Sequence, residues 1–435
     1  MRTFTRKKKY KARDPYETIT LIRNILAERD IFVSENNNYF GEAELSSCRL
    51  WFSDPALSMG DFGTNGKGMN PRYALASAYG ELMERLQNNV LFGDYAENAF
   101  HKGLTSHMAA ADEVMLDSGE ALEEGGEILA RLLRCDLGEL KRGLHASANK
   151  MPCLKFEDVL KGGEVLLPFK TLRMCIGTNG MAAGNTYKEA IIQGMSEIYE
   201  RAAVMEAYRD NPKIPQINPL CFKGNEIYDR LEHLKMYGYD YKILDLSMGK
   251  GYPAVGLRLG IGRAAAFKAG ADPCPVTALE RCLTEMFQGS LSEIQKNFHD
   301  SCCADFKSAD ERMKREISEA EIAYHVDGTG KIARCLFNPA NEFSEDFAGT
   351  DGESEDADFE YMLELTRNLG YGLYVRDSSV LGFPSYQIII PELSNYDLLY
   401  EDGKYVYEWS FDKQEFKNDR ITEGVAAILN KIYSI

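Results

Sequence analysis

The chain has 435 residues, of which 44% are hydrophobic and 27% charged, and this composition excludes wholesale disorder. Its 67 Asp and Glu residues against 50 Lys and Arg residues give a net charge of −17, which repels phosphate backbones and argues against nucleic-acid partners. No apolar run approaches the roughly 18 residues of a spanning helix, and no apolar segment follows the basic N-terminus, so we expect a cytoplasmic protein with no membrane partner.

Hydrophobic periodicity predicts both helices and strands. Apolar residues recur at helical spacing in residues 16–28, 71–90, 121–137, 187–208, 275–295 and 308–323. Short β-type runs bounded by turn residues cover residues 31–33, 48–52, 241–246, 254–259, 264–269, 373–375 and 386–390. Because helices and strands mix without strict alternation, we expect a mixed α+β fold.

Two later segments have distinct compositions. Residues 341–360 hold nine carboxylates and no Lys or Arg, which predicts an exposed loop, and their order is not that of a calcium-binding loop. The tail, residues 396–435, contains no proline. Within it, Val425, Ile428, Leu429 and Ile432 are spaced for an amphipathic helix that packs on this chain or on a partner.

Cysteine and histidine chemistry is not indicated. The ten cysteines are scattered without a C-x-x-C pair, and the six histidines form no H-E-x-x-H pattern. We therefore expect neither a zinc site nor a disulfide framework.

The most informative feature is a repeat. Gly-Thr-Asn-Gly occurs at residues 63–66 and 177–180, and we expect each copy to form a glycine-rich loop before a helix. The same spacing follows both loops: Ala, six residues, Glu, two residues, Glu-Arg. The two copies are Ala74, Glu81, Glu84-Arg85 and Ala190, Glu197, Glu200-Arg201. A third copy, behind residues 270–272, has Ala278, Glu285 and Gln288.

Residues three apart lie on one helix face, so each copy is predicted to present paired oxygens from a single side. Paired carboxylates repel each other and need a cation, either an arginine or a divalent metal, unless they are ordinary solvated charges. Oxygen ligands together with arginines favour Mg²⁺ bound with a nucleoside triphosphate. Neither glycine segment is a P-loop, because Gly66-Lys67-Gly68 lacks the Ser or Thr after Lys.

These residues resemble the YcaO family of ATP-dependent enzymes that modify peptide backbones. The matching stretches are residues 64–68 with 74–81 and 84–85, residues 178–186 with Glu197 and 200–201, and residues 278–281 with 284–285 and 288–289. The likeness extends to about Pro391 and looks greatest to the bacterial subgroup described as an accessory factor for methylthiolation of ribosomal protein S12. We therefore expect a catalytic domain over residues 1–395, with its motifs in 63–90, 177–208 and 270–295, followed by the tail.

The resemblance implies an ATP site between the repeated helices, where glutamates hold Mg²⁺ ions that bridge the ATP phosphates. Carried over to this sequence, the metal ligands are Glu81, Glu84, Glu189, Glu197, Glu200 and Glu285. The implied ATP contacts are Lys11, Thr18, Lys67, Ser77, Asn185, Arg201, Arg281 and Gln288. One departure is Ala182, which replaces a serine of the relative, so a hydroxyl contact to nucleotide is lost or supplied elsewhere.

The implied activity is ATP-dependent modification of a peptide amide to an azoline, thioamide or amidine. Azoline-forming members end in a proline-rich tail, and this tail lacks proline, so a standard azoline product is doubtful. An S12-methylthiolation accessory role stays open, as does a non-catalytic ATP-binding scaffold of a sulfur-modification complex. We expect a peptide or protein substrate, a sulfur-delivery or peptide-recognition partner, and a homodimer.

Overall fold

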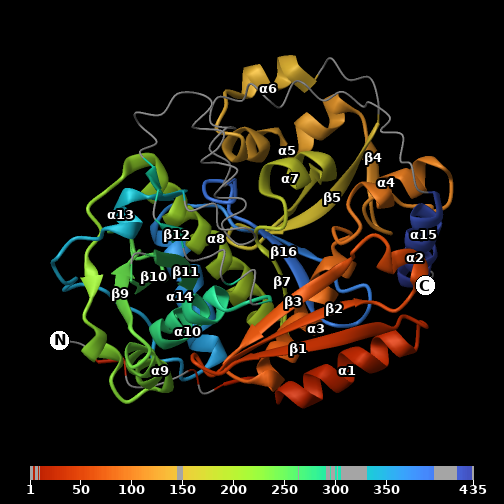
Figure 1. Cartoon of the computed structure of the whole chain (residues 1–435). Helices are drawn as coiled ribbons and strands as arrows, with labels where there is room; N and C mark the ends of the chain where they lie inside the picture. Colours follow the sequence, from red (N-terminus) through yellow and green to blue (C-terminus); the bar gives the residue numbers. More distant parts are fainter. Residues whose placement is uncertain are drawn as a thin grey trace.

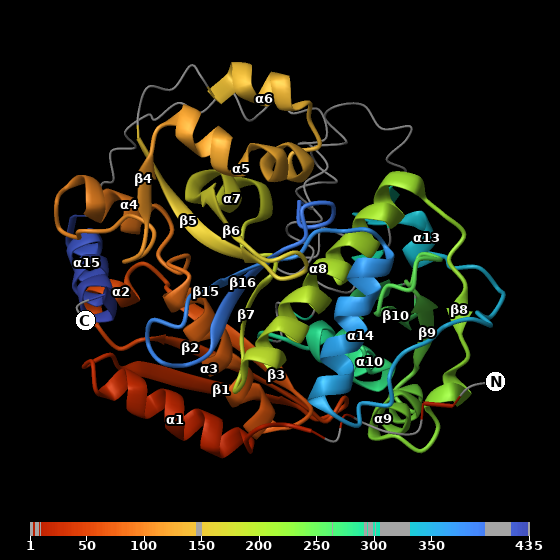
Figure 2. The same cartoon turned by 180° about the vertical axis from the view of Figure 1, so that it is seen from behind.

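The computed structural model describes residues 3–4, 8, 10–144, 150–262, 264–290, 294, 299–300, 302–304, 331–395 and 419–433. It confirms the mixed α+β fold: among the described residues, three larger antiparallel sheets are each faced by one of the three repeated helices, and two short strands form a parallel pair (Figures 1 and 2). The predicted helix at residues 308–323 lies outside the described residues.

The first sheet has the order β1–β2–β3, and its strands pair antiparallel. The first repeated helix, α3, packs on β3 and β2, and α1 packs on α3. The elements are α1 (Pro15–Ala27), β1 (Val33–Phe40), β2 (Leu45–Phe52), α2 (Pro55–Ser58), β3 (Gly63–Gly68), α3 (Pro71–Gln87) and α4 (Asp94–His101).

The second sheet has the order β4–β5–β15–β16–β7, with β6 paired to β5, so it joins the middle of the chain to residues 374–389. The second repeated helix, α8, packs on β16 and β7 and also reaches β11 of the third sheet. The elements are β4 (Val114–Leu116), α5 (Ser118–Leu132), α6 (Leu137–Leu144), β5 (Met151–Asp158), β6 (Glu164–Pro168), α7 (Phe169–Ile176), β7 (Met181–Ala183), α8 (Tyr187–Asp210), α14 (Glu355–Asn368), β15 (Tyr374–Asp377) and β16 (Ser385–Ile389).

The third sheet has the order β12–β11–β10–β9–β8, and the third repeated helix, α10, packs on β11 and β10. The buried apolar residues of α10 form one core with this sheet, and Glu280 and Thr284 are also buried on the helix. The elements are β8 (Gln216–Ile217), a 3₁₀ turn (Pro219–Phe222), α9 (Glu226–Lys235), β9 (Tyr239–Asp245), β10 (Ala254–Ile261), β11 (Ala264–Ala271), α10 (Pro275–Met286) and β12 (His299–Asp300). The short segments β13 (Cys302–Ala304), β14 (Lys331–Ala333) and α13 (Arg334–Phe337) follow.

The repeat is a strand pressed directly against a helix. A Cβ atom added at Gly66 would lie 2.0 Å from the carbonyl oxygen of Ala74, eight residues later. A Cβ atom added at Gly270 would lie 2.5 Å from the carbonyl oxygen of Ala278, at the same spacing. The expectation of a loop at residues 63–66 was therefore wrong: these residues belong to β3, and glycine serves there to let backbone approach backbone.

In the second copy, the strand and the helix also pack closely, but the glycine is at a different position. Ala182 stands eight residues before Ala190, where the other copies have glycine, and it is fully buried in β7. The facing residue of α8 is Gly194, and a Cβ atom added there would lie 3.4 Å from that of Ala182. In this copy the strand carries the methyl group and the helix carries the glycine. Ala182 therefore occupies the space that the absent side chain of Gly194 leaves between the strand and the helix.

Several predicted boundaries were wrong. The helix predicted for residues 275–295 ends at Met286, because the chain turns at Gly289, whose φ is +103°. The acidic segment 341–360 is a loop only up to Ser354, which caps α14 by accepting the N–H of Ala357. Of its carboxylates, Glu355, Asp356 and Asp358 fall in the first turn of α14, where the helix dipole favours negative charge.

The C-terminal helix α15 (Asp419–Tyr433) packs beside α4 and α2, as both views of the fold show. This confirms the amphipathic helix in the tail, and the packing is on this chain. Its buried residues join the core that contains α1 and α3; they are Ile421, Val425, Ile428, Leu429 and Ile432.

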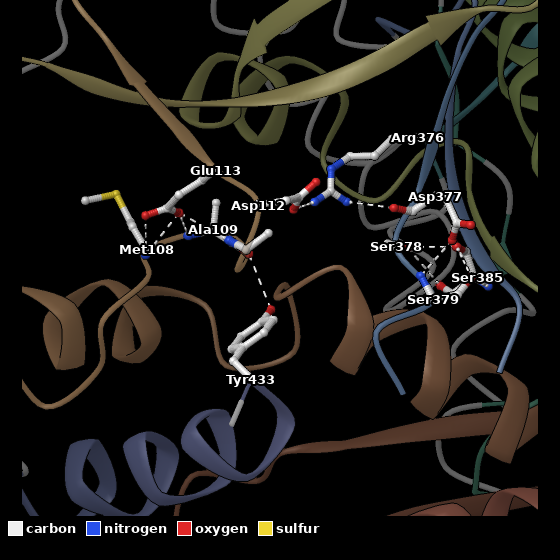
Figure 3. A network of polar contacts seen from close by, with 11 residues as sticks. Met108, Ala109, Asp112, Glu113, Arg376, Asp377, Ser378, Ser379, Ser385 and Tyr433 are labelled. Atoms are coloured by element: carbon white, nitrogen blue, oxygen red, sulfur yellow. Dashed lines mark hydrogen bonds and ion pairs between the residues drawn. The ribbon is translucent and has the colours of Figure 1, made fainter. Parts of the chain in front are cut away.

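A polar network continues from α15 toward the second sheet (Figure 3). The Tyr433 hydroxyl donates to the carbonyl oxygen of Ala109 at 3.4 Å, and Glu113 accepts the N–H of that residue at 2.6 Å. Next to Glu113, the carboxylate of Asp112 pairs with Arg376 of β15. The C-terminal helix is thereby tied to the sheet that carries α8.

No helix among the described residues is long and apolar enough to cross a membrane.

Candidate functional site

One part of the site joins the N-terminal arm to the start of α8. The backbone N–H of Ala12 donates to one carboxylate oxygen of Glu189 at 3.0 Å, and the N–H of Asn185 donates to the other at 3.1 Å. The Thr18 hydroxyl of α1 donates to the side-chain oxygen of Asn185 at 2.9 Å. Four predicted site residues, Lys11, Thr18, Asn185 and Glu189, are thus brought to one place from three segments of the chain.

Opposing charges shape this part of the site. Burial alone would raise the pKa of Glu189, but Lys11 and the N–H donors hold that pKa below its usual value. Burial lowers the pKa of Lys11, and the charges of Lys8 and Arg281 lower it further, while Glu189 and Asp272 oppose this effect. Glu189 is therefore an anion held by hydrogen bonds, beside a cation that the protein partly desolvates.

A second part of the site consists of facing glutamates on α3 and α8. On α3, Arg85 lies 3.6 Å from Glu81 and 3.3 Å from Glu84. On α8, Arg201 pairs with Glu197 at 3.2 Å across one helical turn. The Glu-Arg repeat in the sequence therefore becomes two matched carboxylate–guanidinium groups.

The glutamates of these two helices are close enough to repel one another. The pKa of Glu84 is raised well above its usual value, first by burial and then by the charges of Glu197 and Glu81. Arg85 and Arg201 counter this repulsion without cancelling it. The pKa of Glu81 is also raised, again by burial and by Glu197. The protein's own arginines therefore leave these carboxylates incompletely neutralised.

The third repeated helix completes the site. Lys67 of β3 pairs with Glu285 of α10, and Arg281 of the same helix donates to Gln193 of α8. Burial and the charge of Arg281 lower the pKa of Lys67 to about 8. The carboxylates that oppose this shift on Lys67 belong to α3 and α8: Glu200, Glu81 and Glu197.

One further hydrogen bond and one charge effect join these parts of the structure. Glu200 of α8 accepts the backbone N–H of Ala271, at the end of β11, at 3.2 Å. Arg281 lowers the pKa of both Lys11 and Lys67, so its charge acts on the arm and on the glutamate cluster alike. The first, second and third copies of the repeat and the N-terminal arm therefore share a single charged centre.

Two predicted residues are less directly connected to this centre. Ser77 is half-buried on α3, and Gln288 lies beyond the end of α10, so Gln288 does not share a helix face with Glu285 as predicted. Within the residues that the structure describes, no three His, Cys, Asp or Glu side chains stand close enough to hold a metal ion. The glutamates instead contact arginine, lysine and backbone N–H groups.

Sequence reasoning missed Lys268 and Arg85. Lys268 of β11 is 2% exposed; burial and then Lys67 lower its pKa to about 7, whereas Glu200 acts to raise it. The available signal was a single lysine within the small apolar run of β11. For Arg85, the signal was its place in the repeat, equivalent to Arg201.

The chain is similar to proteins of a known family. Residues 65–394 match the family model described as YcaO cyclodehydratase, ATP- and Mg²⁺-binding. An uncharacterised protein of Haemophilus influenzae is 28% identical over 375 residues, which is 80% of this chain and 60% of that protein. The ribosomal protein S12 methylthiotransferase accessory factor YcaO of Escherichia coli K12 is 25% identical over 363 residues, which is 76% of this chain and 57% of that protein. The chain spans less than two thirds of the length of both relatives.

Two solved structures share the fold. The YcaO protein of Methanopyrus kandleri bound with AMPPCP and Mg²⁺ has a TM-score of 0.54 at 17% identity, with 91% of this chain and 94% of that chain covered. A heterocyclase in complex with substrate and cofactor has a TM-score of 0.58 at 16% identity, with 89% of this chain and 53% of that chain covered.

Proposed function

The chain belongs to the YcaO family, whose domain binds ATP and Mg²⁺, and on that premise we propose that it uses ATP to activate a backbone amide of a peptide substrate. The observation that carries this proposal is the convergence of three repeated helices on one charged centre. Glu84, Glu197 and Glu200 come from two of these helices, and Lys67 joins them to the third.

The donor set fits Mg²⁺. Magnesium is a hard cation that takes carboxylate oxygens and phosphates, and burial together with the charges of Glu197 and Glu81 raises the pKa of Glu84, so a cation there would stabilise its charged form. The residues that would hold the metal are Glu81, Glu84, Glu189, Glu197, Glu200 and Glu285. Because several of these contact arginine or lysine, metal binding requires them to exchange those contacts. The bound metal would neutralise charge on the ATP phosphates.

The cations and amides around the glutamates suit the phosphates of ATP. Arginine binds phosphate oxygens in a bidentate manner, and a lysine at the site adds a point charge. We assign ATP contacts to Lys11, Thr18, Lys67, Ser77, Asn185, Arg201, Arg281 and Gln288. Lys67, with its lowered pKa, stays charged near neutral pH once further negative charge enters the site.

The proposed reaction has three steps. A nucleophile adds to the carbonyl carbon of the amide, and the resulting oxyanion attacks the γ-phosphorus of ATP as the bond to ADP breaks. The carbon–oxygen bond then breaks and phosphate leaves with the former amide oxygen, while a C=N or C=S double bond forms as the amide nitrogen or the nucleophile loses a proton. The residues named above contribute positioning and charge neutralisation, which dominate catalysis of phosphoryl transfer.

Isotope transfer tests this proposal. Candidate peptides are those encoded beside the gene for this chain, synthesised with a heavy oxygen isotope at the backbone carbonyls. The expected result is peptide-stimulated phosphate release in which the phosphate carries the heavy isotope. Phosphate release without label in a modified peptide would contradict amide phosphorylation.

The product class follows from the mass of the modified peptide. Loss of water indicates an azoline, exchange of oxygen for sulfur a thioamide, and exchange of oxygen for nitrogen an amidine. A thioamide product requires a sulfur-delivering partner. A homodimer is part of this proposal and is checked by sedimentation at several concentrations.

A second function is a non-catalytic ATP-binding accessory factor of a sulfur-modification complex. The name of the relative from Escherichia coli favours it. The two functions differ in turnover: a scaffold binds Mg²⁺-ATP without peptide-stimulated hydrolysis, and the Glu84→Gln variant then changes nucleotide affinity alone.

A further inference from the structure

The N-terminal arm is anchored at several points before it reaches the site. The ring of Phe4 is buried, and its centroid lies 5.5 Å from that of Phe222 and 5.8 Å from that of Phe347. The backbone N–H of Phe4 donates to the carbonyl oxygen of Cys221 at 2.6 Å. The arm is thus packed into the core of the third sheet at its beginning.

Closer to the site, the arm is held by two buried carboxylates. The ammonium group of Lys8 lies 2.8 Å from Asp272 and 3.5 Å from Asp358. The Tyr10 hydroxyl donates to the same oxygen of Asp358 at 2.7 Å. Asp358 is 0% exposed and Asp272 is 5% exposed, so these contacts are shielded from water. We call Lys8, Tyr10, Asp272 and Asp358 the arm lock.

The arm lock lies immediately before the residue that enters the site. Lys11 is bracketed by the Tyr10 contact on one side and by the hydrogen bond from Ala12 to Glu189 on the other. Asp272 directly follows β11 and accepts the N–H of Cys274 before α10, so it belongs to the third copy of the repeat. The lock therefore ties Lys11 to two rigid elements, α14 and the β11–α10 connection.

Burying the charges of the arm lock costs free energy unless each charge has a partner. A buried carboxylate loses its hydration, and within the described part of the chain Lys8 and the Tyr10 hydroxyl of the arm are the side chains that contact the carboxylate of Asp358. Removing the charge of Asp358 weakens the hold on the arm, whereas the sheet and helix packing around it stays in place.

We propose that Asp358, with Asp272, acts as a positioning residue that locks the arm so that Lys11 faces the phosphates of ATP. The inference rests on the proposed function, since it assigns Lys11 to the nucleotide. In this proposal Asp358, which lies on α14 and far from Lys11 in the sequence, acts on nucleotide affinity only through Lys11.

The test is a double-mutant cycle read out as the affinity for Mg²⁺-AMPPCP by calorimetry. Asp358→Asn is expected to weaken binding about tenfold, which corresponds to about 1.4 kcal/mol. Lys11→Met is also expected to weaken binding. The double variant should bind no more weakly than Lys11→Met alone, because the lock has nothing left to position.

The chain offers a control on α9 that has the same kinds of contact partner in an exposed setting. Glu232 accepts the Tyr241 hydroxyl at 2.6 Å and pairs with Lys235 at 2.6 Å, as Asp358 does with Tyr10 and Lys8. Glu232→Gln is expected to leave affinity for Mg²⁺-AMPPCP unchanged. If Asp358→Asn does not fold, Tyr10→Phe takes its place in the cycle, because it removes one lock contact without leaving a buried charge.

The outcomes separate the two proposals. Failure of the unaltered protein to bind Mg²⁺-AMPPCP overturns the proposed function. Normal binding by the unaltered protein with equal affinity in Asp358→Asn overturns the lock alone. Additive losses in the double variant also overturn it, since they show a structural effect that does not pass through Lys11.

Discussion

Lys67 of β3 pairs with Glu285 of α10, and this contact joins the first copy of the repeat to the third. The two residues are 218 positions apart in the sequence; Lys67 directly follows Gly66, where β3 contacts α3, and Glu285 lies on α10 beyond Ala278, where that helix contacts Gly270. The pair lies among glutamates of α3 and α8. A change in the charge of this centre therefore changes the electrostatic environment of all three copies.

Mg²⁺-ATP is expected to raise the melting temperature, because a ligand that binds only the folded state stabilises it. At a hundred times its dissociation constant, the ligand adds about 2.7 kcal/mol. Differential scanning fluorimetry with Mg²⁺-ATP, ATP with EDTA, and Mg²⁺ alone measures this. A shift of equal size without the metal would contradict the carboxylate-bound Mg²⁺.

Glu84→Gln and Glu200→Gln are expected to fold normally and to lose at least about tenfold in ATP turnover. The substitution keeps the side-chain shape and removes the charge that would hold the metal; at Glu84 it also relieves repulsion. Glu124→Gln, on the exposed side of α5, is the control and should keep full turnover. Unfolding of the first two variants with normal turnover per folded molecule would show that the glutamates are structural.

Two glycine substitutions on adjoining elements should have opposite effects on stability. Gly66→Ala places a Cβ atom 2.0 Å from a backbone oxygen of α3 and should cost about 3 kcal/mol or more. Gly80→Ala, within α3, meets nothing within 4 Å and should stabilise by about 0.5–1 kcal/mol. Urea unfolding of both variants measures the difference, and a harmless Gly66→Ala would refute the close strand–helix contact.

Leu429→Ala is expected to reduce stability by about 2–5 kcal/mol, because Leu429 is 1% exposed in the core beneath α15. The KM for ATP should not change, since we predict that the tail is not part of the catalytic apparatus. Asn430→Ala, on the exposed side of the same helix, is the control. A raised KM in a Leu429→Ala protein that is still folded would show that the tail acts on the site.

Acid should weaken one ion pair on α4. Although burial raises the pKa of Glu97, its hydrogen bond and ion pair with Lys170 outweigh burial and hold that pKa below its usual value. The unfolded chain therefore binds the proton more readily. The stabilisation is complete above the ordinary pKa of about 4.5 and is lost as the pH falls through the lowered value.

The Glu97→Gln variant tests the direction of this pH dependence of stability. It should be less stable than the unaltered protein by about 1 kcal/mol at pH 7, since the pair is partly exposed. The difference in the free energy of unfolding should shrink as the pH falls below 4.5. A difference that grows toward acid pH would contradict the prediction.

The sequence by itself determined the features that depend on local spacing. Helix periodicity predicted α3, α8 and α10, and the Ala–Glu–Glu-Arg spacing identified the repeat, because residues three and four apart share a helix face whatever surrounds them. The mixed α+β class and the amphipathic helix α15 followed from the same local signals. The YcaO resemblance also came from these motifs, and the family comparison confirmed it.

The tertiary structure alone decided what these elements touch. Whether residues 63–66 form a loop or a strand depends on how closely α3 packs on them, and α10 ends where the chain turns at Gly289. The partners of Lys8 lie 264 and 350 residues away, on elements whose own sequences show no sign of the arm. Burial and long-range pairing change the pKa of a side chain and the cost of its charge, and both are properties of the folded chain that no local pattern encodes.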